Sequence, residues 1–247
     1  MVTALGGDVR AAFRERAEAL DVLRLQTLFP ALVLVPHPDD ETLGCGGLIA
    51  TAASLGLELK LAFLTDGGGS HLGSATWPRD RLVRVRQQEA VTAANRLGVG
   101  RDDIIFLNWP DGNPFPDGTP EFDHTVTGLQ TWLAGSETRS IWATWAQEPH
   151  ADHRAAAAVA DALAARLSPM PERLSYLVWG WQSPELVRAR SVLRLSCSAT
   201  VDQRRQALRC HRTQMSDLVD AAAEGFRIPV ELAALTEEPV EYYLPCR

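Results

Sequence analysis

Four ionisable side chains occur within five positions directly after a short apolar run. The apolar run is ALVLVP at 31–36, and the side chains that follow it are His37, Asp39, Asp40 and Glu41. A continuous apolar run of this length predicts a strand that is buried on both faces. Because ligands of open α/β sheets bind beyond the carboxyl ends of the strands, these residues are candidates for an active site.

A second polar cluster follows another apolar run, RSIWATW at 139–145. Its sequence is Glu148-Pro149-His150-Ala151-Asp152-His153, at the start of a predicted Ala-rich helix. His150 and His153 are three positions apart and therefore lie on one face of a helical turn. One imidazole can bind a metal ion while the other faces the same cavity.

Together, the two clusters offer the donor atoms of a catalytic metal site. His37, Asp40 and His153 would give zinc three N/O ligands and leave a fourth position open, while Asp39 stays an unligated carboxylate. Taken singly, each cluster has a plainer interpretation, because Asp is a good helix N-cap and a histidine at a helix start is often only solvated. Their joint occurrence after two predicted parallel strands favours a metal-dependent hydrolase without choosing its substrate.

The elements that must position these clusters alternate along the chain. Apolar runs predict strands at 31–36, 58–66, 103–109, 139–145, 174–181 and 192–200. Helical spacing predicts helices at 10–27, 46–55, 79–99, 122–134, 153–167 and 201–224. This alternation predicts a Rossmann-like three-layer α/β sandwich, with a mostly parallel sheet and helices on both faces. No repeat or linker divides the chain, so we expect one domain over 1–247, with core motifs in 31–165 and C-terminal strands and a helix in 174–247.

The composition excludes several other classes of protein. The net charge of −7 opposes a nucleic-acid partner, and no apolar stretch is long enough to predict a membrane span. The first 26 residues carry charges throughout, unlike a signal peptide. The four cysteines form no CxxC pair, which is typical of reduced thiols in a cytoplasmic protein. The number of chains that assemble, including a homo-oligomer, is left open.

The two clusters also resemble the paired motifs of a known family. PHPDDETLGCGG, followed more than a hundred positions later by PHADHR, is similar to the LmbE-like, PIG-L-type zinc N-deacetylases. The resemblance covers roughly residues 31–165 by motif and order. It implies a substrate that is a small N-acyl amino-sugar conjugate of the N-acetylglucosamine type. It also implies one Zn²⁺ per chain, with another divalent ion such as Fe²⁺ as the alternative.

The same resemblance implies a role for each residue of the motifs. Asp39 matches the general base, and His150 matches the histidine that polarises the substrate carbonyl or protonates the leaving amine. Asp152 is then a catalytic candidate that would orient His150 or raise its pKa. The implied zinc ligands are the same three residues that the donor chemistry selects: His37, Asp40 and His153.

Two charged residues interrupt the apolar stripe of the predicted helix at 79–99. Arg86 and Glu89 share the face of Leu82 and Ala93, where an unpaired charge is costly. One interpretation is a structural ion pair between Arg86 and Glu89. The other is that Arg86 points towards the pocket and binds an anionic or polyhydroxylated part of the substrate, which a similar RxxE pattern in the family favours. Both stay open at the level of sequence.

Three further polar residues are candidates for substrate binding. Asp66 and Asp111 each follow a predicted strand and could bind a sugar hydroxyl, although Asp-Gly also builds ordinary turns. His211 falls on the apolar face of the last predicted helix, where a satisfied core residue is the plainer interpretation. The segment ALRCHRTQM resembles a stretch late in the family, which favours an approach of His211 or Gln214 to the site.

Other functions are compatible with parts of this pattern. The same groups would serve an amidase that acts on a larger acyl group or on a thiol-sugar conjugate. A metal-binding protein without catalysis is disfavoured because all five key motif residues are present. The segment LGCGG at 43–47 raises a more distant alternative, a transferase that uses a nucleotide cofactor.

Overall fold

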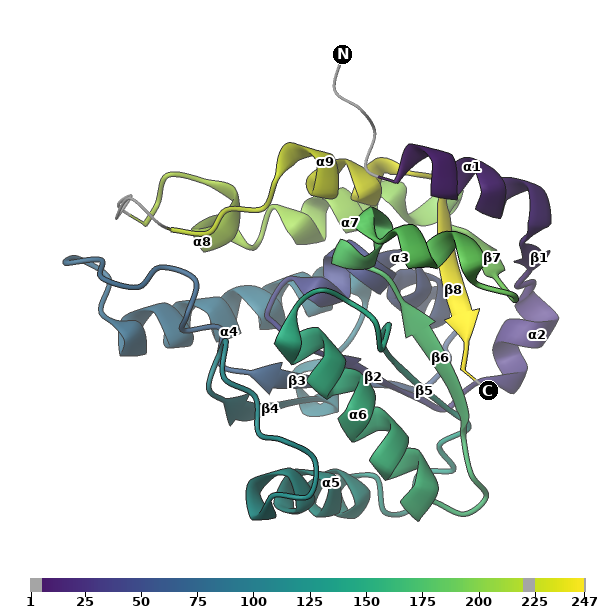
Figure 1. Ribbon diagram of the computed structural model, residues 1–247, viewed down its shortest axis with the longest axis horizontal. Helices are drawn as coiled ribbons and strands as arrows, with labels where there is room; N and C mark the ends of the chain where they lie inside the picture. Colours follow the sequence, from purple (N-terminus) through teal and green to yellow (C-terminus); the bar gives the residue numbers. More distant parts are fainter. Residues whose placement is uncertain (1–5, 220–224, 247) are drawn as a thin grey trace.

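A computed structural model describes residues 6–219 and 225–246. Its centre is an eight-stranded sheet with the order β1-β7-β8-β6-β5-β2-β3-β4 (Figure 1). Neighbouring strands run parallel except where β8 pairs antiparallel with β6 and β7. The strands are Glu18–Ala19 (β1), Ala31–Val35 (β2), Leu59–Thr65 (β3), Ile104–Trp109 (β4), Ser140–Thr144 (β5), Glu172–Tyr176 (β6), Leu193–Ser196 (β7) and Val240–Pro245 (β8). The predicted α/β fold with a mostly parallel sheet is confirmed.

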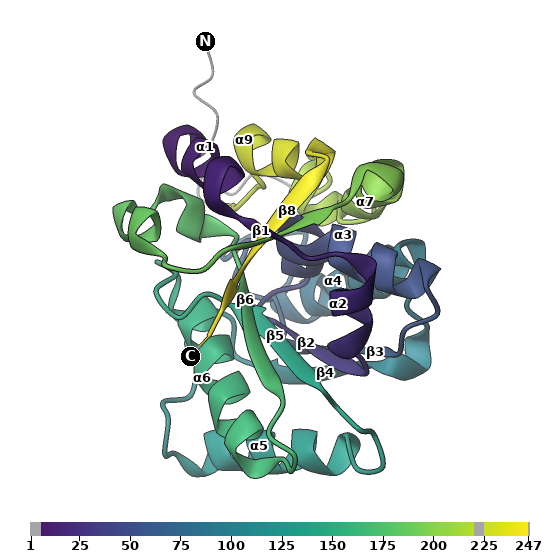
Figure 2. The same ribbon diagram turned by 90° about the vertical axis from the view of Figure 1, so that its right-hand side faces the viewer.

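Helices cover both faces of the sheet. Figures 1 and 2 show α5 and α6 on one side of the central strands and α3, α4 and α7 on the other. The α-helices are Gly7–Arg16 (α1), Val22–Thr27 (α2), Asp40–Ser54 (α3), Arg79–Leu97 (α4), Pro120–Trp132 (α5), Ala151–Arg166 (α6), Val201–Leu208 (α7), Arg212–Met215 (α8) and Val230–Ala233 (α9). Short 3-10 helices occupy Arg101–Asp103, Trp179–Gln182, Pro184–Arg188, Ser198–Thr200 and Ala234–Glu237.

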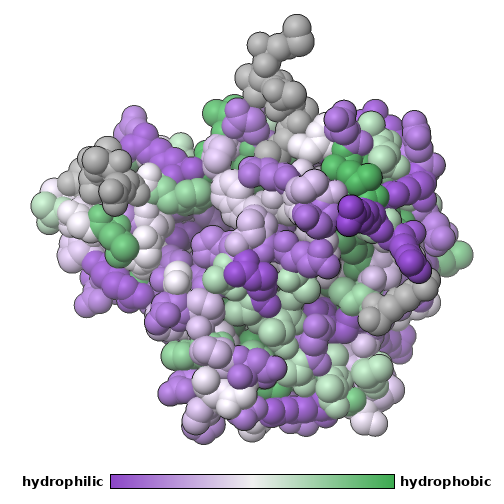
Figure 3. Space-filling model, in the orientation of Figure 1, coloured by the Kyte–Doolittle hydropathy of each residue, from purple (hydrophilic) through white to green (hydrophobic). Residues whose placement is uncertain are grey.

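The face of the molecule seen in Figure 3 is mostly polar. Figure 3 shows the face of Figure 1 covered largely by hydrophilic residues, with apolar residues in small separate groups. Within the described ranges, no helix combines the length and the apolar character needed to cross a membrane.

Strand β2 is buried on both faces, as its continuous apolar run predicts. Ala31, Val33 and Val35 pack in the core shared with α3 and α4, whereas Leu32 and Leu34 pack in the core shared with α5 and α6. Successive side chains of a strand point to opposite faces, so one short run contributes to both cores. Because β2 packs on both faces, its carboxyl end, where the first polar cluster begins, has a fixed position in the core.

The predicted helix at 10–27 is two helices, so that prediction is wrong. Helix α1 ends at Arg16, and the short strand β1 then pairs with β7, with the Glu18 N–H donating to the Val192 carbonyl. The side chain of Asp21 caps the start of α2 by accepting from the Arg24 N–H at 2.8 Å. The pairing of β1 with β7 and the N-cap at Asp21 thus interrupt the helix that the apolar spacing of residues 10–27 predicts.

The predicted strand at 174–181 ends early. Strand β6 stops at Tyr176, and a 3-10 helix begins at Trp179. The Glu148 carboxylate accepts hydrogen bonds from the backbone N–H groups of Val178, Trp179 and Gly180, each at 2.9 Å. These bonds satisfy donors that a longer strand would have given to a neighbouring strand.

The C-terminal region also differs from the prediction of one long helix at 201–224. Helix α7 ends at Leu208 and the four-residue α8 follows, whereas the expected positions 220–224 lie outside the described residues. Strand β8, which was not predicted, then enters the sheet between β6 and β7. Its Glu241 carboxylate accepts from the backbone N–H groups of Gly47 and Leu48 at 2.7 and 2.8 Å.

The glycines of LGCGG lie inside helix α3, not in a loop. A Cβ atom on Gly44 would lie 2.3 Å from Tyr176 Cδ2, and one on Gly47 would lie 2.4 Å from Cys197 Sγ. Both glycines therefore permit close packing of α3 against the C-terminal half of the sheet. The segment is not the glycine-rich turn that a nucleotide-dependent transferase would require.

We predict that Gly47→Ala lowers the free energy of unfolding by about 1–3 kcal/mol, because an added methyl group overpacks this contact. The matched control is Gly128→Ala in α5, where an added Cβ meets nothing within 4 Å. That substitution should stabilise by about 0.5–1 kcal/mol through backbone entropy. Urea denaturation measures both, and a Gly47→Ala midpoint equal to that of the wild type would contradict the packing argument.

Candidate active site

The two polar clusters meet at the carboxyl ends of β2 and β5. These strands pair in parallel, so the residues that follow them emerge at the same edge of the sheet. The ring centroid of His37 lies 4.8 Å from that of His150 and 5.3 Å from that of His153. Two segments more than a hundred positions apart in the sequence are thus brought together.

Several donor atoms converge around His37. Asp40 Oδ2 lies 3.1 Å from His37 Nδ1 and 3.2 Å from His153 Nε2. His37, His150 and His153 each offer a nitrogen within 4.8 Å of the other two. A second group of three with the same spacing is His37, Asp111 and Asp152. The cluster therefore offers more donor atoms than the three predicted ligands supply, although Asp40 lies closer to the imidazoles of His37 and His153 than the 4.8 Å limit that His150 meets.

The residues present fit a divalent metal ion. His153 is fully buried, and its ring nitrogens make no hydrogen bond of good geometry: Glu148 Oε2 lies 3.3 Å from Nδ1 and Asp40 Oδ2 lies 3.2 Å from Nε2. Glu148 can orient the Nδ1 side of the ring, but leaving a buried polar atom such as Nε2 unpaired is costly and needs an explanation. A cation held by imidazole and carboxylate donors would supply one. The Asp152 Oδ1 atom, which is also buried, likewise has no hydrogen-bond partner.

The charges of this cluster are strongly coupled. Burial by itself would raise the pKa of Asp40, but His153 and His37 hold it well below its usual range. Burial lowers the pKa of His153, and Asp40 and Glu148 more than offset this and raise it to about 9. Without a metal ion, the His153 imidazole therefore favours its protonated form.

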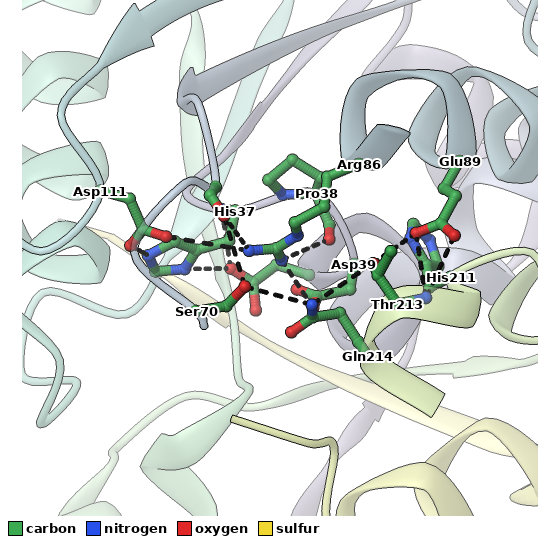
Figure 4. Close-up of polar contacts among 12 residues, drawn as sticks. His37, Pro38, Asp39, Ser70, Arg86, Glu89, Asp111, His211, Thr213 and Gln214 are labelled. Atoms are coloured by element: carbon green, nitrogen blue, oxygen red, sulfur yellow. Dashed lines mark hydrogen bonds and ion pairs between the residues drawn. The ribbon is translucent and has the colours of Figure 1, made fainter. Parts of the chain in front are cut away.

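Asp39 has a strained backbone at the start of α3. Its φ of 148° and ψ of −27° are rarely adopted by L-residues, and such strain costs on the order of 1–3 kcal/mol. The Asp39 N–H donates to Glu41 Oε2 at 3.0 Å, and Asp39 Oδ2 accepts from Arg86 Nη2 at 3.0 Å. Burial raises the pKa of Asp39 to about 7, against the opposing effect of Arg86. The surroundings thus hold this carboxylate in one orientation, as Figure 4 shows.

Arg86 points towards the Asp39 carboxylate and does not pair with Glu89. Its terminal nitrogens donate to the carbonyls of Gly67 and Pro38 at 2.7 and 2.8 Å as well as to Asp39. Glu89 instead accepts from the hydroxyl of Thr213 at 2.6 Å. The ion pair between Arg86 and Glu89 is not formed.

His211 lies behind Asp39 and is fully buried. Its Nε2 atom is 2.8 Å from Glu41 Oε1, which also accepts from the Thr42 hydroxyl at 2.7 Å. The same Glu41 carboxylate holds the N–H of Asp39 through its other oxygen. His211 therefore contacts the motif through Glu41 and is not among the residues that line the cavity described next.

A cavity of about 430 Å³ opens in front of Asp39. Its inner part is polar and includes the candidate residues Asp39, Arg86 and Asp111. Asp111 Oδ1 lies 3.3 Å from His37 Nε2, and its Oδ2 accepts from the Gly69 N–H at 2.8 Å. The complete lining is His37, Asp39, Asp40, Leu43, Gly69, Ser70, Leu72, Arg86, Asp111, Gly112, Asn113, His150, Trp179 and Phe226.

Comparison with known proteins identifies the family. The model of the family "PIG-L: GlcNAc-PI de-N-acetylase" matches residues 32–164, just over half of the chain. The chain belongs to the PIG-L family. It is therefore a deacetylase of the kind that the paired motifs resemble, and the convergence of histidine and aspartate side chains fits the metal dependence of that family.

Individual relatives of this PIG-L protein are deacetylases by name. A probable N-acetyl-alpha-D-glucosaminyl L-malate deacetylase 2 from Bacillus subtilis (strain 168) is 27% identical over 79% of this chain and 88% of its own length. A 1D-myo-inositol 2-acetamido-2-deoxy-alpha-D-glucopyranoside deacetylase from Kineococcus radiotolerans is 35% identical over 41% of this chain and 28% of its own.

Solved structures show that the fold serves more than one reaction. GalB, the 4-carboxy-2-hydroxymuconate hydratase from Pseudomonas putida KT2440, has a TM-score of 0.65 at 16% identity and covers 87% of this chain and 94% of its own. At that identity the likeness concerns the fold alone, so the reaction must be argued from the side chains.

The PIG-L motif residues differ in how they face the cavity. His150 lines it, and 41% of its side chain is exposed. Burial and the neighbouring His37 and His153 lower the pKa of His150, so the free site favours its neutral form. Asp152, expected to orient His150, lies 3.9 Å from its Nδ1 but 2.8 Å from His37 Nε2.

The substrate-binding candidate Asp66 accepts a hydrogen bond from Arg79 at 2.5 Å and is not among the residues that line the cavity.

Glu41 and Glu148 belong to the two motifs of this deacetylase, but the sequence predicted no individual role for either. Glu148 lies 3.3 Å from His153 Nδ1, and Glu41 connects Asp39 with His211. Carboxylates that orient a ligating histidine are common partners in metal sites, so a glutamate five positions before His153 was a usable signal. Trp179 lies near the end of a predicted strand, where a tryptophan could stack on a sugar or an aryl-bearing aglycone, although core packing was the plainer interpretation; Leu72 and Phe226, which also line the cavity, left no such signal.

We predict that His211→Ala destabilises the protein strongly. It removes the partner of the buried Glu41 carboxylate, and breaking a buried ion pair in this way costs about 3–5 kcal/mol. The control is His124→Ala on the exposed side of α5, which should change stability little. Thermal and urea denaturation compare the two, and equal stabilities would refute a paired role for His211.

Proposed function

We propose that this PIG-L protein is a zinc-dependent hydrolase that removes an N-acetyl group from an amino-sugar conjugate of the N-acetylglucosamine type. The observation that carries the proposal is the buried His153 ring, whose Nε2 atom makes no hydrogen bond and lies beside Asp40 and His37. The named activities of the two relatives, on malate and inositol conjugates of the sugar, support the substrate class.

In this proposal, His37, Asp40 and His153 hold the metal ion. Two imidazoles and one carboxylate suit zinc and leave room for further coordination, and Fe²⁺ is the alternative ion. A divalent ion bound there lowers the pKa of water and polarises the amide carbonyl. Asp152 and Glu148 are placed to orient the imidazoles of His37 and His153.

The chain's own groups then move the protons. Asp39 accepts a proton from the attacking water, and a pKa near the working pH suits a general base. Arg86 keeps that carboxylate aimed into the cavity. His150, exposed at the cavity wall, is the group we assign to the substrate carbonyl or, once it has taken up a proton, to the departing amine. Asp111 is placed to accept a hydrogen bond from a sugar hydroxyl.

We predict that Asp39→Asn keeps its bound metal but loses a factor of about 10²–10⁴ in rate, the usual contribution of a general base. His153→Ala should instead lose the metal, because it removes a ligand. Metal content after purification and acetate release from N-acetylglucosaminides measure the two effects. Turnover of Asp39→Asn near that of the wild type would reject the assignment of the base.

We also predict that metal affinity falls with decreasing pH. Burial lowers the pKa of His153, but Asp40 and Glu148 raise it to about 9, so below that pH a proton competes with the ion. Each displaced proton lowers the affinity about tenfold per pH unit. Competition with a chelating dye between about pH 6.5 and 8.5 measures the slope. In Glu148→Gln the pH dependence should move to lower pH, and a pH-independent affinity would show that no proton is displaced.

A further inference from the structure

Three apolar side chains gather at the mouth of the cavity. We call Leu72, Trp179 and Phe226 the apolar rim, and all three line the cavity. Leu72 is 69% exposed and Phe226 is 37% exposed, whereas His37 and Asp40 at the inner end are largely covered. The rings of Trp179 and Phe226 meet edge to face, with centroids 6.0 Å apart. Exposed large apolar side chains at the entrance of a polar pocket indicate a binding surface.

The rim is built from three separate segments that hydrogen bonds hold in place. The Phe226 N–H donates to the Ser70 carbonyl at 2.7 Å, which ties the segment of Phe226 to the loop of Leu72. The Gln214 amide donates to the Ser70 hydroxyl at 3.3 Å, from the side of α8. The Trp179 N–H donates to the buried Glu148 carboxylate. The apolar side chains are therefore positioned by the fold next to the site.

The charges of the lining disfavour an anionic group at this position. Among the described residues that line the cavity, Arg86 is the only Lys or Arg, it is 2% exposed, and its terminal nitrogens are bound to Asp39 and two carbonyls. The carboxylates of Asp39, Asp40 and Asp111 line the same space. A carboxylate or phosphate on the aglycone would therefore lie against the apolar rim with no Lys or Arg side chain of the described lining free to pair with it.

We infer that the aglycone of the substrate is an uncharged aromatic or aliphatic group that packs against the apolar rim. The inference rests on the proposed function, because the reacting amide must lie at the inner end, near His37. An acetyl group is short, so the part of an N-acetyl substrate that extends to the rim belongs to the side of the amine. Packing on Trp179 and Phe226 then selects among conjugates of the same sugar.

The test compares three glycosides of N-acetylglucosamine that differ only in the aglycone: methyl, phenyl and 4-carboxyphenyl. Acetate release should give a kcat/KM for the phenyl glycoside about tenfold above that for the methyl glycoside, from apolar burial on the rim. The 4-carboxyphenyl glycoside, which has the same ring with one added charge, should be a poorer substrate than the phenyl glycoside. Equal values for all three, or preference for the carboxylate, would overturn the inference.

Variants locate the effect on the rim. Leu72→Ala and Phe226→Ala should each lower the ratio of kcat/KM for phenyl over methyl by about threefold or more. The matched control is Leu23→Ala in α2, because Leu23 is 76% exposed and lies outside the cavity lining. Its ratio should equal that of the wild type. An unchanged ratio in both rim variants would reject the rim as the binding surface for the aglycone. If the ratio is unchanged and only the mass measured by sedimentation differs from that of the wild type, the rim is instead a contact between copies of the chain.

Two further measurements separate this inference from the proposed function. Faster hydrolysis of an N-octanoyl methyl glycoside than of the N-acetyl one would assign the rim to the acyl chain and overturn the inference, while leaving an amidase. If none of the glycosides releases acetate, the proposed function fails. Calorimetric binding of the phenyl and methyl glycosides to Asp39→Asn still decides the inference, since tighter binding of the phenyl glycoside supports it and equal binding refutes it.

Discussion

The parallel pairing of β2 with β5 is the constraint on which the site depends. Ala31, Leu32 and Val33 align with Ser140, Ile141 and Trp142, so both strands end at the same edge of the sheet. Parallel strands cannot be joined by a tight turn, and the chain between them is free to form β3, β4 and the helices α3, α4 and α5. A shift of this register would carry one cluster away from the other, since a strand rises about 3.3 Å per residue.

Once the clusters meet, their charges must be balanced in a buried space. Asp40 lies between two imidazoles, Asp39 pairs with Arg86, and Glu41 pairs with His211. Each carboxylate of the first motif thus has its own positive or hydrogen-bonding partner from a different part of the chain. Buried charges without such partners are costly, so the sequence Asp-Asp-Glu is tolerated only because α4, α6 and the residue before α8 bring Arg86, His153 and His211 close.

The sequence predicted the parts of the fold that depend on local pattern. The buried strand at 31–36 and the polar residues at its end follow from a short apolar run and from the geometry of open sheets. The break in the first helix, the early end of β6 and the insertion of β8 all depend on partners distant in sequence, such as Glu148 and Glu241. The periodicity of apolar residues within a short segment does not reveal those partners. The family resemblance favoured an approach of His211 to the site, but its contact with Glu41 was not predictable for the same reason, since an apolar helical face does not reveal which buried group the imidazole meets.

The region that matches the family and the region that follows it contribute different parts of the site. The family match ends at residue 164, and the candidate metal ligands all lie within it. His211, Trp179 and Phe226 lie beyond it, yet His211 holds the glutamate that fixes the strained Asp39, and the two aromatic rings line the mouth. The chemistry of an amide needs only the inner groups. The mouth of the cavity instead combines both parts of the chain, because Leu72 lies within the family match and Trp179 and Phe226 lie beyond it, and the hydrogen bond from the Phe226 N–H to the Ser70 carbonyl joins the two.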